Sequence, residues 1–236
     1  MLLSFKRLCQ KRQPGGWLLF QYRSQHSNAG DVNANKTHIH ELASKRTRAF
    51  VEQAKKEGRV HGKMWKNALD AVQDLKDGSS IMAGGFGLCG IPENLIMATA
   101  KHGAKNLEII SNELGTEKYG LSILLKSGQI KTVWSSFIGN NTPFQEKYFK
   151  GEIYLHLVPQ GNLAERIRAG GAGIPAFYCH TGVDTWHEQG KIPIKYKAGY
   201  PHVIEQFNSK RESRFFGSQK YLLETSLTAD FAFVKC

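Results

Sequence analysis

The segment Gly84-Gly85-Phe86-Gly87-Leu88-Cys89-Gly90-Ile91-Pro92 has the spacing of a turn that could bind a negatively charged group. Four glycines in seven positions remove Cβ atoms where the backbone turns sharply or where another group comes close. A strand-like run at 80–83 precedes the turn, and Pro92 suits the first turn of a following helix. Together these form a candidate site for a carboxylate or another anion. A tight turn that binds no ligand is the alternative interpretation.

Two familiar kinds of glycine-loop site fit this segment poorly. The turn has no Gly-Lys-Ser/Thr ending, which excludes a phosphate-binding P-loop. Gly85, Gly87 and Gly90 do form a Gly-x-Gly-x-x-Gly pattern, and a dinucleotide fold would place an acid about 20 residues further on. Glu108 stands near that distance, but inside a predicted buried strand at 107–110. A dinucleotide fold is therefore a minor alternative.

Alternating helix-like and strand-like segments lead to and from the glycine turn. Short apolar runs between amphipathic segments, with glycines at the breaks, predict parallel βαβ units. The last third is richer in strand-like segments. The sequence thus predicts an α/β fold: a mostly parallel sheet with flanking helices, followed by a β-rich part. The predicted helices are 67–75, 92–102, 120–127, 143–149 and 161–169, and the strands are 80–84, 107–111, 130–137, 153–158, 192–196, 213–216, 220–224 and 229–235.

The overall composition is that of an ordinary globular protein, with 41% hydrophobic and 11% aromatic residues. No apolar stretch is long enough to cross a bilayer as a helix, so no membrane segment is expected. Cys9, Cys89, Cys179 and Cys236 show no Cys-x-x-Cys spacing, which favours neither zinc nor a disulfide framework. We expect Cys89 to be a small buried packing residue rather than a nucleophile.

Positive charge is concentrated at the amino terminus. The net charge is +12, and residues 1–60 supply +8 of it through twelve Lys or Arg and four acids. The first thirty residues contain no acid, and apolar residues alternate there with Lys and Arg, as is typical of a mitochondrial transit peptide. The sequence predicts a transit peptide at 1–30, a polar helix or linker at 31–63, and a domain at 64–236. We therefore expect a matrix protein that binds neither nucleic acid nor membrane.

Two long motifs resemble those of the class I coenzyme A transferases. The first is residues 84–96, Gly-Gly-Phe-Gly-Leu-Cys-Gly-Ile-Pro-Glu-Asn-Leu-Ile. The second is residues 159–178, which begins Pro-Gln-Gly-Asn-Leu-Ala-Glu-Arg and follows in the same order as in the family. Within the family, the A half of the mitochondrial succinyl-CoA:3-ketoacid CoA-transferases resembles the chain most, over roughly residues 65–236.

The resemblance implies transfer of coenzyme A from succinyl-CoA to acetoacetate, a reaction of ketone body metabolism. A glutamate attacks the acyl-CoA thioester and an enzyme–CoA thioester follows, so coenzyme A is part of a substrate and no cofactor is implied. In the family this glutamate stands in a Ser-Glu-Asn-Gly motif of the B half, and the motif is absent here. The resemblance therefore implies an oligomer with a B half or with the parental transferase, and small carboxylic acids and acyl-CoA as ligands.

The second motif places one candidate catalytic residue, Gln160. By resemblance its amide supports the oxyanion that forms on the thioester carbonyl. From the residues alone, Gln160 lies at the carboxyl end of a predicted strand, where α/β proteins place their sites, or is a polar turn residue that caps the next helix. The substrate-binding candidates are Gly84, Gly85, Phe86, Gly90 and Asn112.

The chain departs from the family at two places. The family usually has Ser-Asn-Asn where this chain has Ser111-Asn112-Glu113, and a carboxylate there would repel anionic acids unless Glu113 points away. Residues 179–185 differ from the family's Thr-Pro-Thr-Gly-Tyr-Gly-Thr, which puts the shape of the substrate loop in question. His180 and His187 have no third ligand at suitable spacing, so we expect surface histidines and no metal site.

The helix expected at 161–169 carries two arginines that could attract an anionic substrate. Alternating charges on a helix are more often a solvated face or an ion pair, here with Glu165, and we favour this interpretation for Arg166 and Arg168. The glycine-rich segment 170–173 is expected to end that helix and to let backbones approach closely.

The predicted last strand, 229–235, has no following helix to cover it, so we expect the A-type domain to be incomplete at its carboxyl end. Three hypotheses for function follow. The chain is the A half of a 3-oxoacid CoA-transferase that needs a B half, or a catalytically inactive, truncated paralogue that acts as a binding partner. A generic anion-binding α/β module is the third.

Overall fold

A computed structural model of the chain describes residues 64–199 and 202–235, together with residues 5, 6, 52, 56 and 59–61. The chain divides into two compact units, one formed by residues 9–66 and the other by residues 1–8 and 67–236. In the first unit, β2 (Arg59–His61) and β3 (Met64–Trp65) form an antiparallel pair. Apart from the positions named here, the predicted transit peptide at 1–30 and polar segment at 31–63 lie outside the described residues.

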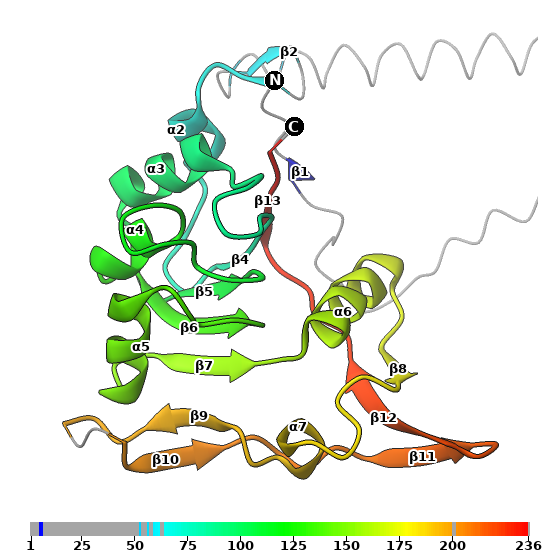
Figure 1. Cartoon of the computed structure of the whole chain (residues 1–236). Coiled ribbons are helices and arrows are strands. Elements are labelled where there is room, and N and C mark those ends of the chain that lie inside the picture. The colour runs from blue at the N-terminus through cyan, green and yellow to red at the C-terminus, as the bar shows by residue number, and fades with distance from the viewer. Residues whose placement is uncertain are drawn as a thin grey trace, which may run out of the picture. The chain divides into compact units, whose positions relative to one another are not determined.

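The larger unit is built on a mixed sheet in the order β1-β13-β4-β5-β6-β7 (Figure 1). In the part of the chain that the structure describes, five of these six strands are parallel and β1 is antiparallel to β13. The predicted mostly parallel sheet is therefore confirmed. The strands are β1 (Phe5–Lys6), β4 (Ser80–Ala83), β5 (Leu107–Ile110), β6 (Ile130–Ser135), β7 (Tyr154–Leu157) and β13 (Phe231–Phe233).

Helices connect the successive parallel strands. Figure 1 shows α3, α4 and α5 side by side along one flank of the sheet, and α6 beyond the arrowheads of β5, β6 and β7. Among the described residues, no helix combines the length and the apolar character that crossing a membrane would require. The helices are α2 (Ala68–Ala71), α3 (Glu93–His102), α4 (Ser122–Lys126), α5 (Thr142–Phe149) and α6 (Gln160–Ala172).

A row of fully buried aliphatic side chains crosses the sheet. Strand pairing aligns one residue from each of β4 to β7, and each of the four is 0% exposed. Removing such side chains from water stabilises the fold by about 1.5–3 kcal/mol each, so the row sets the register of the strands. Its members are Ile81, Ile109, Val133 and Leu155.

The opposite face of the sheet packs against α6. Because side chains alternate along a strand, Met82, Ile110 and Trp134 point away from the buried row. These residues form one cluster with Leu163 and Ile167 of α6. The contact fixes α6, which begins directly after β7, relative to the carboxyl ends of the strands.

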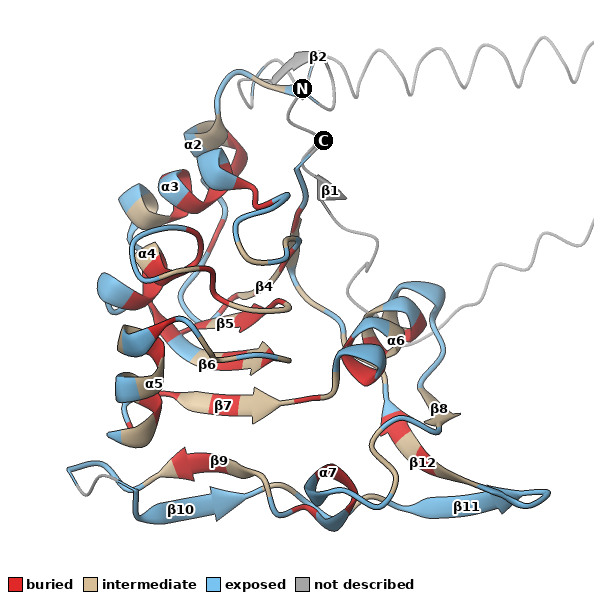
Figure 2. Cartoon of the chain, in the orientation of Figure 1, coloured by how far each residue is buried: buried red, intermediate tan, exposed pale blue. Residues whose placement is uncertain are grey.

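The last third is rich in strands, as predicted, and most of them pair antiparallel. One sheet pairs β9 with β10 and the other has the order β11-β12-β8. Figure 2 shows β10 and β11 exposed along their length. The sequence did not predict β8, β10 or α7. All four residues of β10 are exposed, so this strand lacks the alternation of buried and exposed residues that predicts a strand. The elements are β8 (Ala176–Cys179), α7 (Trp186–Gln189), β9 (Pro193–Tyr196), β10 (Ile204–Phe207), β11 (Ser213–Phe216) and β12 (Gln219–Thr225).

The glycine-rich segment 170–173 lies at the end of α6. The helix continues through Gly170 and Gly171 and ends at Gly173, which has the left-handed conformation with φ of 73°. The segment 170–173 therefore ends α6, as predicted, although the helix extends three residues beyond its predicted last residue, 169. The predicted close approach is present, because an ideal Cβ on Gly170 would lie 1.8 Å from the Leu227 carbonyl oxygen.

Gly170 and Gly171 offer a matched test of this packing. Gly170→Ala should lower the free energy of unfolding by about 1–3 kcal/mol, because α6 or the segment at Leu227 must move. Gly171→Ala meets no atom within 4 Å and should raise the free energy by up to about 1 kcal/mol through helix propensity. Urea unfolding of both variants measures the difference, and equal stabilities would contradict the close approach.

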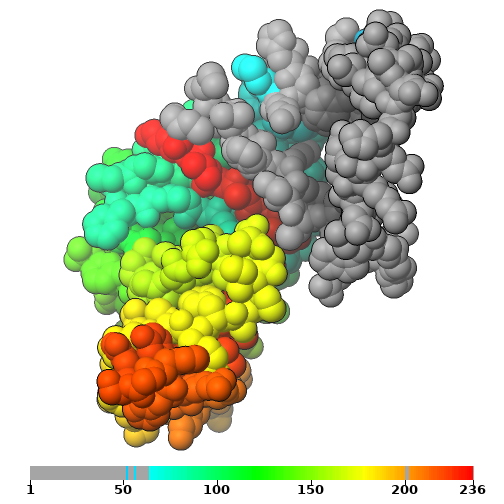
Figure 3. All heavy atoms as spheres, turned by 90° about the vertical axis from the view of Figure 1, so that its right-hand side faces the viewer, coloured from blue at the N-terminus to red at the C-terminus, as the bar shows by residue number. Residues whose placement is uncertain are grey.

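A buried cluster of polar side chains joins α6 to α7 and β12. Glu224 is 1% exposed, and its carboxylate lies 2.5 Å from His187 Nε2 and 3.4 Å from Arg211 Nε. Asn162 donates to the same carboxylate at 3.0 Å, and Arg166 Nε lies 3.8 Å from it. Figure 3 shows the yellow part of the chain, to which α6 belongs, next to the orange part.

Two surface predictions are wrong at this cluster. Arg166 and His187 are both 4% exposed, whereas the alternating charges predicted a solvated face and a surface histidine. The predicted ion pair exists at Arg168, which donates to Glu165 at 2.8 Å on the exposed face. Helical periodicity separates the two arginines, since the buried positions of α6 are 162, 163, 166 and 169.

The charges around Glu224 keep it ionised. Burial alone would raise the pKa of this carboxyl group, but the hydrogen bond to His187 and the charges of Arg211 and Arg166 hold the pKa below its usual value. Removing one partner of such a buried carboxylate strongly destabilises the folded protein, because a buried charge is left unpaired. The cluster therefore fastens α6, and Gln160 at its start, to the antiparallel part.

Candidate functional site

The candidate site lies where β4, β5, β6 and β7 end. The glycine turn follows β4, residues 111–113 follow β5, Ser136 follows β6 and Gln160 follows β7. Because the carboxyl ends of parallel strands meet at one edge of the sheet, four segments far apart in sequence converge here. This is the edge that faces α6 in Figure 1.

Gln160 is held by two hydrogen bonds to its side-chain oxygen. Asn112 Nδ2 donates to this oxygen at 2.7 Å, and Ser136 Oγ donates at 2.5 Å. With its oxygen occupied by two donors, the amide nitrogen of Gln160 is turned outward as a donor, and none of the described residues accepts a bond from it. Gln160 is the first residue of α6 and no side chain caps this helix end, so the capping interpretation is not confirmed.

The backbone of the sheet positions the two donors. The Ser136 amide donates to the Asn112 carbonyl at 2.9 Å, and the Ser135 hydroxyl donates to the same carbonyl at 2.8 Å. The Ser111 amide donates to the Trp134 carbonyl at 3.0 Å. These bonds continue the β5–β6 ladder past the strand ends, so the sheet register places Asn112 and Ser136 beside Gln160.

Ser136 is a site residue that the sequence analysis missed. It lay inside the strand predicted at 130–137, whereas β6 ends at Ser135. A hydroxyl residue at the carboxyl end of a parallel strand was the available signal. The strand boundary, however, is the least certain part of a prediction from hydrophobic pattern.

The glycine turn is a tight, self-contained loop. Phe86 and Cys89 exchange two backbone hydrogen bonds of 3.0 Å each. Gly85 has φ of 137°, and an ideal Cβ there would lie 2.7 Å from Ile91 Cγ2. The neighbour that requires glycine at this position is thus Ile91 of the same loop. Phe86 lies at the tip of this turn and is 74% exposed, so its side chain is available for contact with another molecule.

Cys89 is exposed, so the prediction of a buried packing residue is wrong. The two bonds between Phe86 and Cys89 close the loop on itself, and this leaves the cysteine on the outer surface of the turn. The pattern of glycines could not show this, because it indicates a turn and not which way its side chains point.

Glu113 points toward the glycine turn. The amide of Gly87 donates a hydrogen bond to its carboxylate. Gly87 has φ of 60°, in the left-handed region that favours glycine. Glu113 therefore points toward the glycine turn and not away from it.

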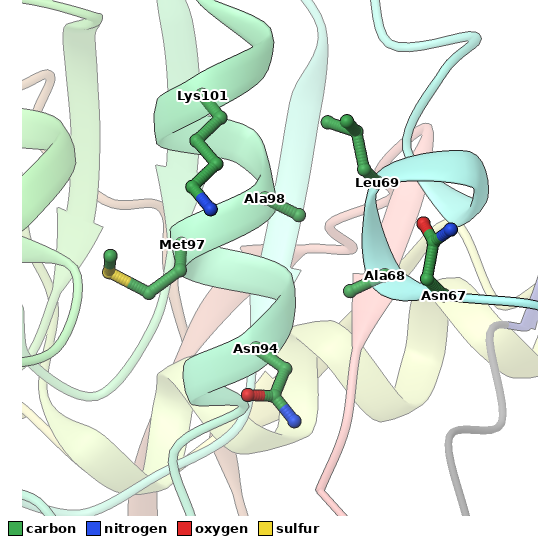
Figure 4. Close-up of a pocket in the computed structure, with 7 residues that line it drawn as sticks. All are labelled: Asn67, Ala68, Leu69, Asn94, Met97, Ala98 and Lys101. Atoms are coloured by element: carbon green, nitrogen blue, oxygen red, sulfur yellow. The ribbon is translucent and has the colours of Figure 1, made fainter.

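A separate hollow of about 520 Å³ lies between α2 and α3 (Figure 4). None of the predicted site residues lines it, and it contains no carboxylate, thiol or hydroxyl that could do chemistry. Its single charged group is Lys101, at the end of α3. The hollow is lined by Asn67, Ala68, Leu69, Asn94, Met97, Ala98 and Lys101.

An ion pair and a polar contact hold the segment at 179–185 against β12. Lys220 Nζ lies 3.1 Å from Asp184 and 2.6 Å from Glu188. His180 Nδ1 lies 2.9 Å from the Lys220 carbonyl oxygen. Within the described residues no group of three His, Cys, Asp or Glu side chains is arranged to hold a metal ion.

The family model for coenzyme A transferases matches residues 66–236. The chain belongs to the coenzyme A transferase family. The match includes the glycine turn, Glu113 and the whole of the Gln160 network. The resemblance stated from two motifs is therefore confirmed over the larger unit.

Curated relatives place the chain with one branch of the family. It is 47% identical over 173 residues to "Succinyl-CoA:3-ketoacid coenzyme A transferase 2A, mitochondrial" of Rattus norvegicus, covering 73% of this chain and 33% of the relative. It is 42% identical over 174 residues to the A subunit of a probable succinyl-CoA:3-ketoacid coenzyme A transferase of Bacillus subtilis, covering 74% and 65%. The chain thus spans about a third of the length of the rat relative and resembles the A half of a transferase.

A solved structure confirms the fold. The apoenzyme of the acyl-CoA transferase of Escherichia coli O157:H7 matches with a TM-score of 0.58 and 22% identity, covering 71% of this chain and 33% of that one. At this identity the likeness establishes the α/β coenzyme A transferase fold.

Proposed function

We propose that this chain supplies the A half of a 3-oxoacid CoA-transferase that moves coenzyme A from succinyl-CoA to acetoacetate. The supporting observation is the Gln160 amide, whose oxygen is held by Asn112 and Ser136. A donor fixed in this way is what a thioester carbonyl requires when it becomes an oxyanion. The names of the rat and Bacillus subtilis relatives agree with this reaction.

In this proposal a B half contributes the nucleophile. A glutamate oxygen adds to the thioester carbonyl, and negative charge develops on the carbonyl oxygen as this new bond forms. When the oxyanion collapses, the bond to sulfur breaks and coenzyme A leaves as its thiolate. Gln160 Nε2 donates to the carbonyl oxygen. The sequence of 236 residues contains no Ser-Glu-Asn-Gly motif, and the Bacillus subtilis relative is named as the A subunit of its enzyme. Both facts favour a B half as the source of the nucleophile.

The substrate-binding residues receive separate roles. We assign Asn112 to positioning, because its amide already donates to Gln160. The glycine turn contributes surface to the bound acyl-CoA through Phe86, which is exposed at the tip. Gly84, Gly85 and Gly90 shape that turn, and the Gly84 amide fastens it to the Phe233 carbonyl at 3.0 Å.

The proposal is tested with three samples: the purified chain, a B half from a related transferase, and the mixture of the two. We expect transfer of coenzyme A between succinate and acetoacetate in the mixture and none with the chain alone. A stable complex without turnover would instead support the inactive binding partner. A borohydride-sensitive CoA thioester on the isolated chain would show that one of its own carboxylates is the nucleophile, and Glu113 would be the first to replace.

We propose further that residues 1–30 are a mitochondrial transit peptide and that residues 64–236 form the A-type domain. The rat relative is named as mitochondrial, and the first thirty residues contain no acid. A reporter fused to residues 1–60 should be imported into the matrix, as followed by microscopy and by protection from protease. A reporter that stays diffuse in the cytosol would contradict the transit peptide.

A further inference from the structure

The sheet formed by β8, β11 and β12 buries one of its two faces. Side chains alternate between the faces of a strand, and in β12 Leu222 is 0% exposed and Glu224 is 1% exposed. Asn162 of α6 donates to Glu224 at 3.0 Å, so α6 lies against this face. Tyr221 and Leu223, which alternate with the buried pair, are half-buried and belong to the opposite face.

Aromatic side chains gather on this opposite face. The strand register pairs Tyr178 of β8 with Leu223 of β12. It also pairs Arg214 of β11 with Tyr221 of β12, so side chains from all three strands share the face. The ring of Phe216 contacts the rings of Tyr178 and Tyr221 edge to face, with centroids 5.1 Å and 5.4 Å apart. We call the set Tyr178, Arg214, Phe216, Tyr221 and Leu223 the aromatic face.

The aromatic face has the composition of a protein interface, where Tyr, Phe and Arg are enriched. Phe216 is 48% exposed, and every residue of β11 is exposed (Figure 2). The Arg214 guanidinium lies 5.4 Å from the centre of the Phe216 ring. Among the described residues no carboxylate forms an ion pair with Arg214, so a carboxylate of another protein can pair with it.

The strand β8 leads from the aromatic face to the candidate site. It ends at Cys179, and Thr181 follows in the next loop. Asn162 Nδ2 donates to the Thr181 carbonyl at 3.1 Å, and an ideal Cβ on Gly161 would lie 3.2 Å from Thr181 Oγ1. The end of β8 thus lies beside the start of α6, where Gln160 stands. A second protein that brings a nucleophile to Gln160 therefore comes close to this sheet.

We propose that the aromatic face is a docking surface for the B half of the transferase, which presents apolar side chains to Phe216 and Tyr221 and a carboxylate to Arg214. The matched part covers 33% of the rat relative, so most of that protein is available to cover such a face. The proposal rests on the proposed function, because the B half is the partner that this function requires.

The B half of a related transferase, the same protein as in the turnover assay, is titrated into the full chain without substrates, and the affinity is measured by isothermal titration calorimetry. Phe216→Ser should weaken the complex by roughly 10- to 100-fold, as expected for an aromatic anchor of an interface. Arg214→Glu should weaken it by roughly tenfold, because the partner's carboxylate then faces a like charge. Arg214 is exposed, so this variant tests the surface even where Phe216→Ser destabilises the sheet.

Phe215→Ser is the matched control. Phe215 precedes Phe216 in β11 and is more exposed, at 65%, but alternation directs its side chain to the other face of the sheet. Its replacement should change the affinity less than about twofold. At about 1 M salt, where the Debye length falls to about 3 Å, the loss in Arg214→Glu should shrink and the loss in Phe216→Ser should remain.

Equal losses in Phe215→Ser and Phe216→Ser, or no loss in either variant of the aromatic face, would overturn the proposal. So would the absence of any complex with the wild-type chain. A Phe216→Ser chain that loses self-association in analytical ultracentrifugation, but keeps its affinity for the B half, would show that the face joins two copies of this chain instead.

The titration does not depend on turnover. A wild-type complex that these variants weaken, but that transfers no coenzyme A, would contradict the proposed function and leave the docking surface in place.

Discussion

Replacing Gln160 with Ala should reduce turnover of the chain assembled with a B half by roughly 10²–10³-fold, as for loss of one oxyanion donor. The side chain is exposed at the start of α6 and its oxygen contacts Asn112 and Ser136 alone among the described residues. The fold should therefore survive the change. Steady-state kinetics should show the loss mainly in kcat, because the donor acts on charge that develops in the transition state.

Asn112→Asp tests the orientation of the Gln160 amide. An aspartate cannot donate to the Gln160 oxygen but accepts from its nitrogen, so the amide should rotate and withdraw its donor. We expect a loss approaching that of Gln160→Ala. Gln189→Ala, an exposed glutamine on α7, is the matched control and should keep full activity. Near-normal turnover in both site variants would show that Gln160 does not stabilise the oxyanion.

Replacing Glu224 with Gln should lower the free energy of unfolding by about 3–5 kcal/mol, the usual cost of breaking a buried ion pair. The change leaves Arg166, Arg211 and His187 around a neutral group in a buried cluster. Urea unfolding at neutral pH gives the difference. Glu165→Gln removes the exposed partner of Arg168 and, as the control on the same helix, should cost less than about 1 kcal/mol.

The same variant has a predicted effect on acid stability. The folded pKa of Glu224 lies below its unfolded value, so its contribution is present above the unfolded pKa, about 4.3 for a free glutamate, and is lost as pH falls through the folded pKa. Wild-type stability should therefore fall with pH in this range more steeply than that of Glu224→Gln. Parallel curves below pH about 4 would show that Glu224 is not the group that couples acid to unfolding.

The sequence by itself determined the succession of elements and the family. Apolar periods of two and of 3.6 residues, broken by glycines, are local properties, and they predicted β4 to β7, α3 to α5 and the β-rich last third. The glycine turn and the motif at Gln160 are also local, because each stands on one continuous segment. These features were readable because neighbouring residues alone produce them.

The tertiary structure decided what those residues face. Gln160 contacts Asn112 and Ser136, which lie 48 and 24 residues away in the sequence. Glu113 contacts Gly87, which lies 26 residues away. Each contact therefore depends on strand register rather than on sequence spacing. Arg166 is buried because its side of α6 meets β12, and β12 lies 59 residues away at Thr225. Whether a charged side chain is solvated or buried depends on which segment packs over it. An amphipathic pattern shows that a helix has a buried face but does not show which segment covers that face.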